Sequence, residues 1–156
     1  MLIIGLGNPD RGDDAAGILV ARNLREHGIK AVEHAGAMLA LLDRWAVSER
    51  VIVIDAVVSG AAPGSIQVWD PWKVPLKRTL FRASTHEFSL ADTIELARVL
   101  NRLPTWIRIY GIEANRFETG IEPSEEVVSA AKRVTVEIER IVAGGLSVST
   151  RAGTRT

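Results

Sequence analysis

Two carboxylates and one imidazole have the residue types and spacing to do chemistry together. Asp14 follows the glycine-rich stretch "GLGNPDRGD", Asp55 directly follows the apolar run "VIVI", and His86 lies in "STHEF". Carboxylate oxygens and an imidazole nitrogen form a ligand set that suits a divalent transition metal. The same groups could equally position and deprotonate a water molecule. Because they come from distant parts of the chain, only the fold can bring them together.

The elements that must position these residues alternate between apolar strands and amphipathic helices. Strands are predicted at residues 2–6, 30–33, 51–54, 66–69 and 106–112, and helices at 14–27, 37–45, 89–103 and 123–142. The strand at 51–54 contains only β-branched residues, which suits a parallel strand covered on both faces. This order predicts an α/β fold: a three-layer α/β/α sandwich with a mostly parallel, five-stranded twisted sheet of phosphorylase/hydrolase-like type. The strand at 66–69 alternates like an edge strand and is expected to be antiparallel.

In such a sheet the functional residues collect beyond the carboxyl ends of the strands, which is where Asp14, Asp55 and His86 are expected. Each also has a structural alternative. An aspartate at 13 or 14 could cap the following helix. Asp55 could bind loop amides, and His86 could be an ordinary loop histidine. The hypothesis of a site therefore depends on the coincidence of all three.

Length and composition predict one soluble domain over residues 1–145, followed by a flexible tail at 146–156. Lys+Arg and Asp+Glu both number 19, so no basic field favours nucleic acid. The absence of cysteine excludes disulfides, thiolate metal ligands and a cysteine nucleophile. Without a basic leader or an apolar run of about 18 residues, we expect a cytoplasmic protein that does not enter a membrane. No apolar stripe is left over for a dimer, which favours a monomer. Trp72 is the tryptophan expected to be exposed.

Several common motifs are incomplete. "GLGN" lacks the third glycine of a dinucleotide-binding turn, and "HEFSL" lacks the second histidine of a zincin helix. No G-x-S-x-G elbow is present. His34 follows the second predicted strand and could join the site, although a structural role is favoured.

Four motifs in order resemble the hydrogenase maturation proteases. "GLGNPDRGDDAAG" resembles the opening of that family, and "VIVIDAV" resembles its second motif, a strand that ends in Asp-Ala. "STHEFSLADTIELARVL" resembles its third motif, a histidine before a leucine-rich helix. "GIEANRFETGIEPSEEVVSAAKRVTVEI" resembles its C-terminal part. The similarity spans about residues 1–143.

The resemblance implies an endopeptidase that removes a C-terminal extension from the large-subunit precursor of a nickel–iron hydrogenase after nickel insertion. The family's metal-binding positions, two acidic residues and one histidine, fall on Asp14, Asp55 and His86. The resemblance implies that these three residues serve both in catalysis and in metal binding. The nickel would be carried by the substrate, with no tightly bound cofactor of the protein's own. The first position is often glutamate in the family, so Asp14 would hold a ligand closer to the backbone.

The resemblance also has departures and rivals. Many members carry Asp-x-Gly-Thr after the second strand, where this chain has "EHAGAM", with His34 near the acidic place. "GLGNP" also resembles the start of peptidyl-tRNA hydrolase, but the segment with that family's catalytic histidine is missing. A second alternative is a nickel-sensing chaperone that docks on the large subunit without cutting it. A third is a structural domain with incidental carboxylates.

Overall fold

The computed structural model describes residues 1–47, 49–81 and 88–144. The strands are β1 Leu2–Leu6, β2 Val32–His34, β3 Arg50–Val57, β4 Ile66–Trp69 and β5 Trp106–Glu113. The α-helices are α1 Ala16–Glu26, α2 Leu41–Arg44, α3 Leu90–Val99 and α4 Glu125–Gly144. Short 3₁₀ turns are η1 Gly12–Ala15, η2 Met38–Ala40 and η3 Arg78–Phe81.

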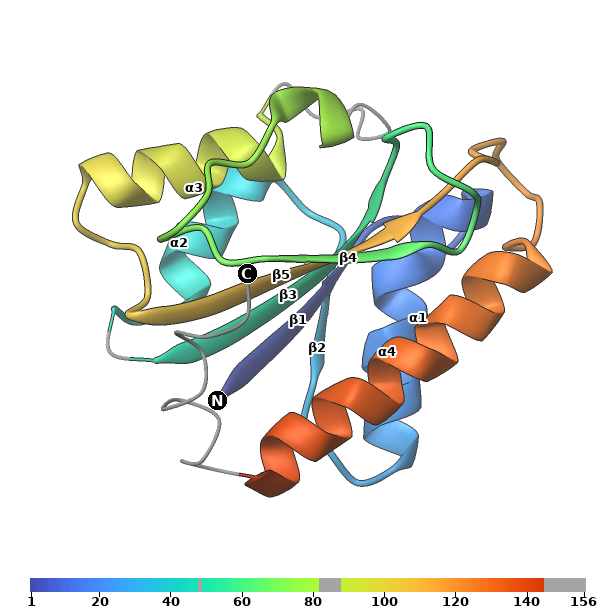
Figure 1. Ribbon diagram of the computed structural model, residues 1–156, viewed down its shortest axis with the longest axis horizontal. Coiled ribbons are helices and arrows are strands. Elements are labelled where there is room, and N and C mark those ends of the chain that lie inside the picture. Colours follow the sequence, from blue (N-terminus) through green and yellow to red (C-terminus); the bar gives the residue numbers. More distant parts are fainter. Residues whose placement is uncertain (48, 82–87, 145–156) are drawn as a thin grey trace.

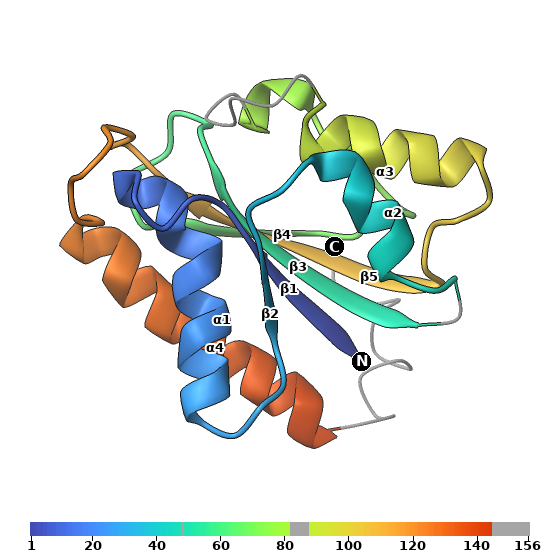
Figure 2. The ribbon, with the colours of Figure 1, turned by 180° about the vertical axis from the view of Figure 1, so that it is seen from behind.

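The strands form one sheet in the order β2-β1-β3-β5-β4. All neighbouring pairs are parallel except β4 with β5, which is antiparallel at the edge of the sheet. Asp55 pairs with Gly111, and Leu6 pairs with His34. The carboxyl ends of the four parallel strands therefore share one edge. Figure 2 shows the chain leaving β2 toward α2 at that edge.

Helices cover both faces of the sheet, so the predicted three-layer sandwich is confirmed. Figure 1 shows α1 and α4 together on one face, with α2 and α3 on the other. Alternate residues of β3 follow this division, because successive strand side chains point to opposite faces. Ile52 and Ile54 pack into the apolar cluster with α1 and α4, whereas Val51 and Val53 pack into the cluster with α2 and α3.

The boundaries differ from the predictions in two informative places. β3 continues to Val57, so Asp55 lies inside the strand and not after it. α3 ends at Val99, short of the predicted residue 103. Asn101 has a positive φ of 55°, and the N–H of Arg102 donates to the carbonyl of Ala97 at 2.7 Å. This left-handed C-cap ends the helix, and asparagine takes the role that glycine usually has.

The predicted capping box and the exposed tryptophan are both present in the structure. Ser89 caps α3 through a capping box with Asp92, as predicted. Trp72 is 51% exposed, which is also confirmed. The predicted tail at 146–156 lies outside the described residues. No helix in the described ranges is long and apolar enough to cross a membrane.

Candidate functional site

Close packing of α1 on the sheet sets the position of the site. A Cβ placed on Gly17 would lie 2.2 Å from the carbonyl oxygen of Ile54, and one on Gly5 would lie 2.1 Å from the carbonyl oxygen of Gly17. No real Cβ tolerates these distances, so the glycines let the start of α1 contact the ends of β1 and β3. The contact brings the residues just before α1 next to the residue just after Ile54.

The turn after β1 delivers Asp14 to this place. Gly7 has a φ of 132°, which only glycine adopts readily, and a Cβ there would lie 1.9 Å from the carbonyl oxygen of Asp14. Asp14 lies in η1 and is 8% exposed. Arg11 lies at the limit of ion-pair distance, 3.9 Å from the Asp14 carboxylate. The N-cap of α1 is Ala15, with no side-chain cap, so the capping alternative for Asp13 or Asp14 is wrong.

Asp55 meets Asp14 from β3. Its side chain is 6% exposed, and the N–H of Ala56 donates to its Oδ1 at 2.8 Å. Burial and the nearby charge of Asp14 raise the pKa of Asp55 to about 8, against the smaller opposing effect of the Ala56 N–H. The fold therefore brings two of the three predicted residues into electrostatic contact, and they form a pair that resists carrying two negative charges.

His86 lies outside the described residues, so its predicted place beside this pair stays a prediction. Among the residues that the structure does describe, no group of three or more histidine, cysteine, aspartate or glutamate side chains is arranged to hold a metal ion. Asp14 and Asp55 would supply the carboxylate oxygen ligands of the predicted metal site. The burial of both carboxylates and the raised pKa of Asp55 fit a place that a cation would stabilise.

Asp13, the neighbour of Asp14, has a different role. It is fully buried, and its carboxylate accepts backbone N–H groups from Asn115 and Arg116 at 3.0 Å and from Ser124 at 2.7 Å. Burial opposes its charge, but these donors outweigh that effect and lower its pKa. Asp13 thus ties η1 to the loop that precedes α4.

Glu113 is a buried acid that the sequence prediction missed. It ends β5, is 2% exposed, and accepts both the backbone N–H and the hydroxyl of Ser59, the latter at 2.5 Å. Glu113 therefore fixes the loop that follows β3. The signal was present, because an acid at the end of the apolar stretch "WIRIYGIE" is the same pattern that pointed to Asp55.

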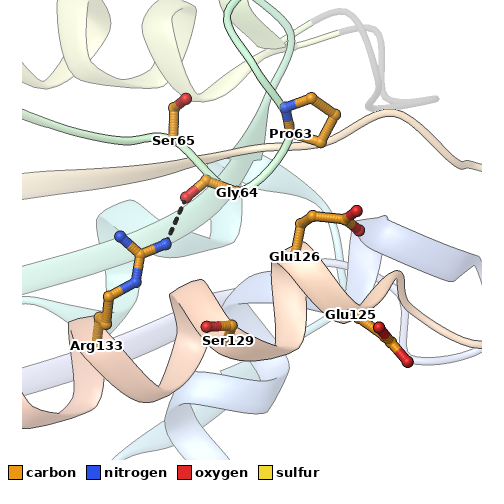
Figure 3. Close-up of a pocket in the computed structure, with 7 residues that line it drawn as sticks. All are labelled: Pro63, Gly64, Ser65, Glu125, Glu126, Ser129 and Arg133. Carbon is orange, nitrogen blue, oxygen red and sulfur yellow. Dashed lines mark hydrogen bonds between the residues drawn. The ribbon is translucent and has the colours of Figure 1, made fainter.

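A solvent-open hollow of about 480 Å³ lies elsewhere, between the β3–β4 loop and the first half of α4 (Figure 3). Arg133 lines it and donates to the carbonyl of Gly64 at 3.0 Å. Neither Asp14 nor Asp55 lines this hollow. The Asp14–Asp55 pair and this hollow are therefore two different sites.

Several proteins that this chain resembles are named as hydrogenase maturation or formation proteins. Residues 22–141 match the family described as hydrogenase maturation protease. The hydrogenase expression/formation protein HoxM of Azotobacter vinelandii is 25% identical over 146 residues, which cover 88% of this chain and 70% of HoxM. The [NiFe] hydrogenase maturation protease HycI of Thermococcus kodakarensis has a TM-score of 0.71 at 27% identity, over 91% of both chains. The hydrogenase maturating endopeptidase HybD of E. coli, at 23% identity, shares the fold with a TM-score of 0.73, over 92% of this chain and 93% of HybD.

Because the family match covers well over half of the chain, this chain belongs to the hydrogenase maturation proteases. The predicted resemblance is confirmed, and so is the expectation of an enzyme that cleaves peptide bonds. Asp55 and His86 lie within the matched range, whereas Asp14 precedes it. Family membership favours the protease over the chaperone and over the peptidyl-tRNA hydrolase alternative.

Proposed function

We propose that this protein removes the C-terminal extension from the large-subunit precursor of a nickel–iron hydrogenase after the nickel has been inserted. The observation that carries the proposal is the buried pair of Asp14 and Asp55, at the carboxyl edge of the sheet in a member of this family. Asp14, Asp55 and His86 engage the nickel ion that the precursor brings. The protein acts in the cytoplasm, as a monomer, without a tightly bound cofactor of its own.

The electrostatics of the pair explain how the nickel could be recognised. Burial and the charge of Asp14 raise the pKa of Asp55, so near neutral pH the pair retains a proton. A divalent cation between the carboxylates would remove the repulsion and release that proton. A precursor without nickel brings no positive charge to offset the repulsion between the two carboxylates. The site would therefore bind the loaded precursor in preference to the empty one.

The chemistry of cleavage can use the same groups. Water adds to the scissile carbonyl carbon, the carbon–nitrogen bond breaks, and the leaving amine takes a proton. An ionised carboxylate of the pair can accept the proton of the attacking water. The substrate's nickel can polarise the carbonyl as a Lewis acid. Both roles need the two side chains at the place where nickel arrives.

Mass spectrometry of a purified precursor tests the proposal, with and without nickel and with wild-type protein or Asp14→Asn. We expect loss of a C-terminal peptide only from the nickel-loaded precursor, and at least about a 100-fold slower loss with Asp14→Asn. The matched control is Asp43→Asn, because the Asp43 side chain is 84% exposed on α2. Equal cleavage of both precursors would overturn nickel recognition, and full activity of Asp14→Asn would overturn the site.

A further inference from the structure

His34 is a buried imidazole with one nitrogen that finds no partner. The residue ends β2 and is 4% exposed. Its Nε2 lies 2.9 Å from the carbonyl oxygen of Ala37, and because a carbonyl only accepts, Nε2 is the donor of this hydrogen bond. Its Nδ1 is buried and has no hydrogen-bond partner among the residues that the structure describes. An arrangement that leaves a buried ring nitrogen unpaired costs stability, which calls for an explanation at this edge of the sheet.

His34 is joined to the Asp14 turn through the backbone. The N–H of Gly7 donates to the carbonyl of His34 at 3.3 Å. Gly7 in turn lies against the carbonyl of Asp14, where a Cβ would have no room. The segments at Asp14, Gly7 and His34 therefore lie side by side at the carboxyl edge. Any substrate chain that reaches Asp14 has the turn after His34 as a near neighbour.

That turn, residues 35–37, has the properties of a backbone binding surface. Ala35, Gly36 and Ala37 are all exposed, and none carries a bulky side chain. Within the described chain, the amides of Gly36 and Ala37 donate to no acceptor. Ala37 has an extended conformation, with φ −60° and ψ 139°. Unpaired amides at exposed residues, one of which is extended, are groups that a passing peptide strand can pair with.

We propose that His34 is a positioning residue for the precursor, an inference that rests on the proposed function. Its Nε2–H fixes the carbonyl of Ala37. The turn 35–37 is thereby held so that its free amides bind backbone carbonyls of an extended segment of the precursor beside Asp14. The histidine itself touches neither the scissile bond nor the nickel. Its contribution is to substrate binding, through the shape of this turn.

Two variants separate positioning from a purely structural role. His34→Leu removes both the donor and the unpaired Nδ1, so the melting temperature should stay the same or rise. Ala37→Pro removes one exposed amide at a φ that proline adopts, so its fold should also be kept. We expect both variants to raise the KM for nickel-loaded precursor about five- to tenfold, with kcat within about twofold of wild type. His34→Gln, which retains a donor for Ala37, should recover much of the loss.

The control is His27→Gln, a histidine that is exposed at the end of α1 and contacts Glu139. It should leave both KM and kcat unchanged. If His34→Leu lowers the melting temperature while KM stays at the wild-type value, the role is structural and the inference is wrong. An unchanged KM for Ala37→Pro would also overturn it, since the amide would then bind nothing. If wild-type protein fails to cleave the precursor at all, the proposed function itself fails, which is a distinguishable result.

Discussion

Asp13 and Asp55 are both buried carboxylates at one edge of the sheet, yet their surroundings shift their pKa values in opposite directions. Asp13 accepts three backbone N–H groups from the loop before α4, and its pKa is lowered in spite of burial. Asp55 accepts one N–H, and burial with the charge of Asp14 raises its pKa to about 8. Three backbone donors outweigh burial at Asp13, whereas at Asp55 burial and the charge of Asp14 act in the same direction, which distinguishes an anchor of the fold from the acid proposed to act at the site.

The largest expected effect is on the free energy of unfolding, at Asp13, which anchors the loop before α4. Asp13→Ala leaves three backbone N–H groups without their acceptor, which should cost about 3–5 kcal/mol of the free energy of unfolding. Urea unfolding at pH 7 measures it. Asp10→Ala is the matched control, because Asp10 is exposed, and it should change stability by less than about 0.5 kcal/mol. Equal, small effects of the two variants would show that Asp13 is no anchor.

A smaller effect of opposite sign is expected at Asp55. The folded-state pKa lies above the unfolded value of 3.8, so the stability contributed by the protonated carboxyl is present below about pH 4 and is lost as the pH rises through about 8. Asp55→Asn should therefore stabilise the protein increasingly as the pH rises from about 4 to 8, and by nothing near pH 4. The amide retains an oxygen that can accept the N–H of Ala56.

Unfolding of wild type and Asp55→Asn at a series of pH values from 4 to 9 measures this. Asp13 gives the contrast within the same molecule. Since its folded-state pKa is lowered, its contribution is present above the unfolded value of 3.8 and is lost as the pH falls through the lower folded-state value. A difference between wild type and Asp55→Asn that did not change with pH would contradict the raised pKa.

The smallest expected effect tests whether the two carboxylates of the site interact. Asp14→Asn removes the negative charge that faces Asp55, so the pKa of Asp55 should fall by about one unit, while burial keeps it above its usual range. Carbon NMR of the Asp55 carboxyl group over a pH titration measures the change. An unchanged pKa would mean that Asp14 and Asp55 are too far apart to act as a pair.

The architecture could be predicted from sequence because its signals are local. The β-branched run 51–54 and the helical stripes on either side of it were enough to predict the parallel sheet and its two helical layers. The errors were at element ends. The apolar run predicts a strand that ends at Ile54, but β3 continues through the polar Asp55 to Val57. The asparagine C-cap at Asn101 was not distinguished from continuing helix.

The site could be predicted only in part. Asp14 and Asp55 were expected to lie near each other because parallel strands share a carboxyl edge, and the charge of Asp14 is close enough to raise the pKa of Asp55. Which aspartate of the pair 13–14 has which role depends on backbone donors about a hundred residues away, at 115–124, which no local pattern contains. The burial of the His34 ring likewise depends on tertiary packing.

The most direct measurement is cleavage of nickel-loaded precursor by Asp55→Asn beside wild type at pH 7, with the stability of both proteins measured in the same buffer. The account predicts that the variant is more stable than wild type and at least about 100-fold slower, because the buried carboxyl is costly to the fold and required at the site. A stabilised variant that releases the C-terminal peptide at the wild-type rate would contradict the assignment of Asp55.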